Sequence, residues 1–109
     1  MQAISRSELK QMNEARHDDF VLINVLPPEA FNREHIRTSV NIPLQDDGFE
    51  QLVEKVAGNK QRKIVVYCAS HDCDASLKAA RRLEEAGFKQ VYDYEGGSQD
   101  WFEQRQGTA

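Results

Sequence analysis

The stretch that decides the fold is "KIVVYCASHDCDASLKAARRLEEAGF", residues 63–88. Its continuous apolar run at 63–68 is typical of a strand covered on both faces. A polar segment follows over 69–74, and small or apolar side chains then recur along one helix face: Ser76, Ala79, Ala80, Leu83 and Ala86. Gly87 stands where a helix ends. The stretch therefore predicts a strand, a loop and a helix, with Cys68 at the end of the strand.

Strand-like and helix-like segments also alternate through the rest of the chain. Strands are expected at 20–25 ("FVLINV"), 39–43 ("SVNIP") and 91–94 ("VYDY"). Such alternation is typical of a parallel sheet with helices on both sides. The predicted fold class is therefore α/β, with a central, mostly parallel sheet of four to five short strands flanked by helices on both faces.

Helix starts and stops support this pattern. Ser5 and Glu8 have the spacing of a capping box. Asp47 and Glu50 offer a second capping pair, ahead of apolar residues at helical spacing over 49–56. A further short helix is expected to open at Pro28, and a last one around Trp101 and Phe102.

Composition narrows the class of protein. A length of 109 residues predicts one domain over 1–109. The net charge of −4, with acids and bases interleaved, argues against nucleic-acid binding. No apolar run approaches the ~20 residues that cross a bilayer, and the first residues lack a signal-peptide core. Two cysteines without an export signal favour the reducing cytoplasm. The sequence does not indicate the oligomeric state.

Cys68 is the main candidate for chemistry. Sites in open α/β sheets gather beyond the carboxyl ends of strands. The helix start that follows favours an anion, and cysteines in such settings have a pKa of ~3.5–7.5. A thiolate there would be a nucleophile. The alternative is that Cys68 is simply a small core residue at a strand end.

Other cysteine chemistries are less well supported. Cys68, His71 and Cys73 are too close together for a usual zinc site and lack a fourth ligand. Cys68 and Cys73 do not form a C-x-x-C pair, although a reversible disulfide between them stays open. We expect no metal and no organic cofactor.

Four landmarks in order carry a family resemblance: "PPEAFNREHI" (27–36), "SVNIP", "VVYC…AA..L...GF" and "VYDYEGGSQDW" (91–101). With them the chain resembles single-domain rhodanese-like sulfurtransferases from about Phe20 to Trp101. The resemblance implies that Cys68 is catalytic and carries a sulfane sulfur as a persulfide. It also implies a substrate-binding loop whose N–H groups hold the outer sulfur, formed by Ala69, Ser70, His71, Asp72, Cys73 and Asp74. The implied partners are a small sulfur donor or a persulfidated carrier protein, and the acceptor is a thiol, cyanide or a carrier protein.

Two departures from the family pattern bear on the donor. Asn24 and Leu26 stand where the family usually has Asp and Arg. The loop carries Asp72 and Asp74 where a basic residue is usual, and only His71 could become cationic. Like charge beside a thiolate raises its pKa and repels a dianion. We therefore expect a persulfide donor rather than thiosulfate.

Two other functions remain possible interpretations of the sequence besides that of an enzyme. The chain could be a catalytically weak rhodanese-fold interaction module, or a sulfur- or redox-sensing module that uses Cys68 and Cys73. A phosphatase is disfavoured, because Asp74 stands where such an enzyme needs an arginine. We also expect His35 to fix a turn rather than act in chemistry, and Gly96 and Gly97 to form a turn with positive φ.

Overall fold

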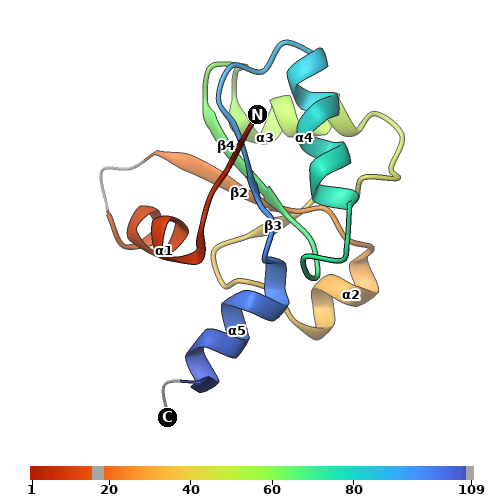
Figure 1. The fold of residues 1–109 in the computed structure, drawn as a ribbon. Coiled ribbons are helices and arrows are strands. Elements are labelled where there is room, and N and C mark those ends of the chain that lie inside the picture. Colours follow the sequence, from red (N-terminus) through yellow and green to blue (C-terminus); the bar gives the residue numbers. More distant parts are fainter. Residues whose placement is uncertain (16–18, 108–109) are drawn as a thin grey trace.

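The computed structural model describes residues 1–15 and 19–107, with side chains for 1–15 and 19–103. Its centre is a five-stranded parallel sheet in the order β1-β5-β4-β2-β3 (Figure 1). The strands are β1 (Gln2–Ala3), β2 (Phe20–Asn24), β3 (Val40–Asn41), β4 (Lys63–Tyr67) and β5 (Val91–Tyr94). The helices are α1 (Arg6–Glu14), α2 (Pro28–Arg33), α3 (Phe49–Ala57), α4 (Ala75–Glu85) and α5 (Gly97–Gly107). The predicted α/β fold class is confirmed.

Strand β4 is the central strand, and this decides where Cys68 lies. Tyr67, the last residue of β4, is level with Asn24 of β2 on one side and with Tyr94 of β5 on the other. Cys68 follows directly. Because all strands run parallel, Cys68 stands in the middle of the edge formed by their carboxyl ends, where sites of open α/β folds gather.

The sheet separates two apolar cores. Ile64, Val66 and Cys68 point to one face and pack with residues of α3 and α4. Val65 and Tyr67 point to the other face, where α1 and α5 cover them. This alternation follows from the two-residue period of a strand. The continuous apolar run of β4 is therefore explained by burial on both faces.

Helix ends agree with the sequence in part. Ser5 caps α1 and forms the predicted capping box with Glu8. The predicted pair Asp47 and Glu50 is wrong as a cap, because Gly48 is the N-cap of α3 and makes no side-chain hydrogen bond. Glu50 instead forms an ion pair with Arg82 of α4, at 2.8 Å between Oε2 and Nε.

Two strands differ from the prediction. The strand expected over 39–43 is only Val40–Asn41, although the Ile42 and Leu44 N–H groups still donate to the chain of β2. Pro43 has no N–H and ends regular pairing. Strand β1 was not predicted, because two residues carry no readable period. Among the described helices, none is long and apolar enough to cross a bilayer.

Candidate active site

The main chain at Cys68 is held by the start of α5. The N–H of Ser98 donates to the Cys68 carbonyl at 3.0 Å, and the N–H of Gln99 donates to the Ala69 carbonyl at 2.8 Å. Gly97 makes this approach possible, since a Cβ there would lie 2.4 Å from the Cys68 oxygen. Gly97 has φ +67°, whereas Gly96 is not in the positive-φ region, so that part of the prediction is wrong.

The Cys68 thiol is buried and has polar groups of two residues, Cys73 and Ser76, around it. Its side chain has no exposed surface and belongs to the core between the sheet, α3 and α4. The Sγ donates to the Cys73 carbonyl oxygen at 3.3 Å and lies 3.6 Å from the Ser76 Oγ. Ser76 belongs to the first turn of α4 and is also buried. The thiol therefore lies between the loop and the start of the helix.

The pKa of Cys68 is raised, not lowered as the helix start suggested. Burial is the main cause, and a hydrogen bond with the Cys73 thiol also raises this pKa. The Ser76 hydroxyl and N–H lower it, as expected for groups that stabilise a thiolate. In this conformation desolvation outweighs the helix terminus, so the neutral thiol is favoured.

The loop over 69–74 does not surround the sulfur with amides. Ala69, His71, Asp72 and Asp74 are exposed, and Ser70 and Cys73 are half-buried. The Cys73 N–H donates to the Ser70 carbonyl at 3.0 Å, and no N–H of this loop, all of which is described, donates to Sγ. In the thiol state the loop thus turns a carbonyl toward Sγ, and the cradle of loop N–H groups around the outer sulfur of a persulfide stays a prediction.

Sequence reasoning missed Asp93, a buried carboxyl on β5. The side chain is 1% exposed and its Oδ1 has no hydrogen-bond partner. Burial raises its pKa, the Ser76 hydroxyl lowers it, and the charge of Glu95 raises it. Asp93 pairs with Val66, so it points to the same sheet face as Cys68. The alternation of "VYDY" was the signal, since it places Asp93 beside Val91.

Asn24 and Leu26, which stand where the family usually has Asp and Arg, form an uncharged strand end. The Asn24 side-chain oxygen accepts from the Leu26 N–H at 2.9 Å, and the Asn41 amide donates to the Leu26 carbonyl at 2.9 Å. Nδ2 of Asn24 is buried without a partner. Hydrogen bonds thus hold this segment without the ion pair that Asp and Arg would supply.

His35 has the structural role that was expected. Its Nδ1 donates to the Phe31 carbonyl at 2.7 Å, and the two rings stack with centroids 3.8 Å apart. Among the described residues, no group of three or more His, Cys, Asp or Glu side chains is placed to hold a metal ion.

Comparison with known proteins places this fold and sequence in a family. The pattern of the rhodanese-like domain matches residues 5–104. The chain belongs to the rhodanese-like domain family. It is 27% identical to the thiosulfate sulfurtransferase GlpE of Coxiella burnetii (strain RSA 493 / Nine Mile phase I) over 95 residues, which cover 87% of this chain and 83% of that protein. The family resemblance seen in the sequence is confirmed.

A relative of a second kind matches most of this chain in sequence. The HTH-type transcriptional regulator Rv0324 of Mycobacterium tuberculosis is 31% identical over 100 residues, which cover 91% of this chain and 41% of the regulator. Among solved structures, the BH2092 protein of Bacillus halodurans has a TM-score of 0.84 at 23% identity, over 95% of this chain and 73% of its own. A rhodanese with anions from E. coli has a TM-score of 0.63 at 28% identity, and the match covers 74% of this chain and 89% of that one.

Proposed function

We propose that the protein is a sulfurtransferase that carries a sulfane sulfur on Cys68. The Cys68 thiolate attacks the outer sulfur of a persulfide donor, the donor S–S bond breaks, and the donor leaves as a thiolate. The Cys68 persulfide is then attacked at its outer sulfur by a thiol, cyanide or carrier-protein acceptor. That second step breaks the new S–S bond and restores the Cys68 thiolate, so no net oxidation occurs.

The position of Cys68 carries this proposal. Its sulfur lies at the end of the central strand and 3.6 Å from the hydroxyl of Ser76, in the first turn of α4. Both the hydroxyl and the N–H of Ser76 favour the thiolate. Membership of a family that includes thiosulfate sulfurtransferases supports the same reaction class.

Reaction requires the loop over 69–74 to move, because the Cys68 side chain has no exposed surface. Movement of this loop would expose Sγ and remove the Cys73 thiol from it. Both effects that raise the pKa of Cys68 would then weaken together, whereas Ser76 would remain in place on α4. Opening of the loop would thus admit the donor and activate the nucleophile in one step.

The charge of the loop favours a persulfide donor over thiosulfate. Asp72 and Asp74 are both exposed. Lys78 lies 3.4 Å from Asp74 and offsets part of its charge, but Asp72 has no ion-pair partner in the described part of the chain. A carboxylate on the loop that follows Cys68 repels a dianion such as thiosulfate more than a donor of lower charge.

Intact mass measurement after incubation with glutathione persulfide tests the proposal. We expect a mass gain of one sulfur atom in the wild type and in Cys73→Ser, and no gain in Cys68→Ser. Subsequent addition of cyanide should remove the added sulfur and yield thiocyanate. An adduct that persists in Cys68→Ser, or no adduct in the wild type at any donor concentration, would contradict it.

A sensing module is the second candidate, and the buried thiol favours it. The Cys68 Sγ lies 3.3 Å from the Cys73 carbonyl oxygen, and the Cys73 side chain contributes to the raised pKa of Cys68. Two such thiols could reduce hydrogen peroxide to water and form a disulfide. A transcriptional regulator among the relatives fits this use of the domain. Thiol counting after mild peroxide tests the idea: both thiols should disappear together and return with reductant, whereas loss of only one would exclude it.

A further inference from the structure

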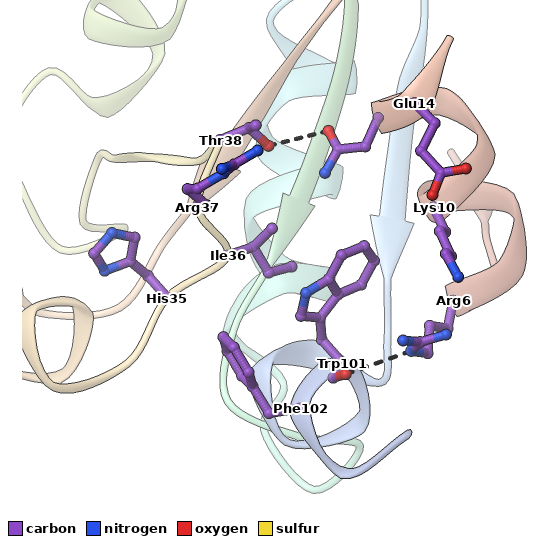
Figure 2. A pocket seen from close by; sticks show the side chains of 10 residues that line it. Arg6, Lys10, Glu14, His35, Ile36, Arg37, Thr38, Trp101 and Phe102 are labelled. Atoms are coloured by element: carbon purple, nitrogen blue, oxygen red, sulfur yellow. Dashed lines mark hydrogen bonds between the residues drawn. The ribbon is translucent and has the colours of Figure 1, made fainter. Parts of the chain in front are cut away.

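A cavity of about 590 Å³ lies on the sheet face opposite to the Cys68 side chain. Its walls are α1, the segment 35–38 ahead of β3, and the first turns of α5 (Figure 2). Small-molecule sites usually have a volume of roughly 300–1,000 Å³. The cavity therefore has the size of a site for a small organic ligand.

The charged residues that line this cavity are mainly basic. Arg6 and Lys10 lie one helical turn apart on α1, and Arg37 stands on the opposite wall (Figure 2). Among the residues with described side chains, Glu14 is the one carboxylate that lines it. Lys10 and Arg37 form no ion pair with any described residue, although the chain has 18 acidic residues and a net charge of −4. Cations without ion-pair partners on two walls of one cavity favour an anion there.

An aromatic surface lies between these cations. Trp101 is half-buried and stands in the middle of the cavity between the two basic walls (Figure 2). The Arg6 guanidinium lies over its ring, 5.2 Å from the centroid, and Tyr94 meets it edge-on at 6.3 Å. The indole is thus held in one orientation, and its exposed part lines the cavity.

Hydrogen bonds connect the walls to one another. The Thr38 hydroxyl donates to the Asn13 side-chain oxygen at 3.0 Å, which joins the segment 35–38 to α1. The Arg6 Nε donates to the Trp101 carbonyl at 3.4 Å, which joins α1 to α5. Because three separate segments are joined in this way, the cavity is a preformed feature rather than a gap between independent parts.

We propose that this cavity binds a small organic anion, with its phosphate or carboxylate group between Lys10 and Arg37 and its planar part on Trp101. The site is distinct from Cys68, whose side chain lies in the other core. Its occupancy does not depend on sulfur transfer, so the binding test and the persulfide test can fail separately.

Phenyl phosphate and benzoate are suitable probes, because each combines one anionic group with one ring. Trp101 is the only tryptophan of the chain, so its fluorescence reports the cavity directly. We expect either probe to change this fluorescence in a saturable way, and inorganic phosphate and phenol to bind more weakly. The measurement uses the full chain at low ionic strength.

Matched variants locate the site. Lys10→Gln with Arg37→Gln should weaken binding of the probe by about tenfold, since charge-assisted hydrogen bonds are about twice as strong as neutral ones. Lys55→Gln with Arg81→Gln removes the same charge from exposed positions on α3 and α4, and should leave binding unchanged. Equal weakening in both pairs, or no saturable change with either probe, would overturn the proposal.

Discussion

The Oγ of Ser76 lies 3.6 Å from the Sγ of Cys68, at the point where α4 begins. This hydroxyl lowers the pKa of Cys68 against the opposing effect of burial. It also lowers the pKa of Asp93, whose side chain points to the same face of the sheet as that of Cys68. One buried hydroxyl therefore acts on two buried ionisable groups, Cys68 and Asp93, and its removal should be visible in each of them.

Ser76→Ala should slow alkylation of Cys68 by iodoacetamide. Loss of the hydroxyl raises the pKa of Cys68 further, so less thiolate is present at a given pH below that pKa. The expected decrease is about tenfold, because a hydrogen bond to a charged group is worth roughly 1.5 kcal/mol or more. The measurement is a pH–rate profile by mass spectrometry in a Cys73→Ser background, so that only Cys68 reacts.

Ser98→Ala is the matched control for this experiment. Ser98 is also buried, but its Oγ has no hydrogen-bond partner. Its N–H, which holds the Cys68 carbonyl, is kept in the variant. An identical pH–rate profile for Ser76→Ala and wild type would show that the hydroxyl does not act on the thiol.

Asp93→Asn should stabilise the protein at neutral pH. The pKa of Asp93 is raised by burial, so the folded chain holds this proton more tightly than the unfolded chain. Stability is therefore lost as the pH rises from the unfolded pKa, about 3.9, through the folded pKa. Asparagine has no ionisable carboxyl, so the variant does not lose stability in this way as the pH rises. The variant should gain several degrees in Tm at pH 7, since about 1 kcal/mol shifts Tm by roughly 4–8 °C.

Thermal unfolding between pH 4 and 8 checks the sign of this effect. The gain of Asp93→Asn over wild type should shrink toward pH 4, because the carboxyl of the unfolded wild-type chain begins to bind its proton near its pKa of about 3.9. Asp46→Asn, at an exposed position, should follow the wild type throughout. A gain that is independent of pH would show that packing, rather than ionisation of Asp93, is responsible.

Gly97→Ala should destabilise the protein more than Gly58→Ala. Both glycines have positive φ, +67° and +95°, so alanine is strained at each. Only at Gly97 would the new Cβ meet main chain, 2.4 Å from the Cys68 oxygen, whereas Gly58 has open space. We expect about 1 kcal/mol of strain at Gly58 and roughly 1–3 kcal/mol more at Gly97. Urea unfolding compares the two, and equal losses would exclude the contact as the cause.

Asp72→Asn should increase turnover of thiosulfate at low ionic strength. Removal of one exposed carboxylate from the loop lowers its repulsion of a dianionic donor. The expected increase is about twofold to threefold, because exposed charge pairs are worth roughly 0.2–1 kcal/mol. The increase should vanish in high salt, and Asp46→Asn should show none. Rapid wild-type turnover of thiosulfate, unchanged in Asp72→Asn, would show that the loop charge does not select the donor.

Much of the fold could be predicted because its signals are local. The apolar run of β4 and the small residues on one face of α4 follow from strand and helix periods, and the Ser5 cap lies within one turn. The two-residue strands β1 and β3 carry no such period. Their pairing depends on neighbouring strands that are distant in the sequence.

The amino-acid sequence by itself determined the α/β fold, the family and the position of Cys68 between a strand and a helix. Only the tertiary structure decided the state of that thiol. Whether a helix start or burial controls its pKa depends on how completely α3, α4 and the loop exclude water, and none of these contacts is local. For the same reason Asp93, 25 residues along the chain, becomes a neighbour of the site only when β5 pairs with β4.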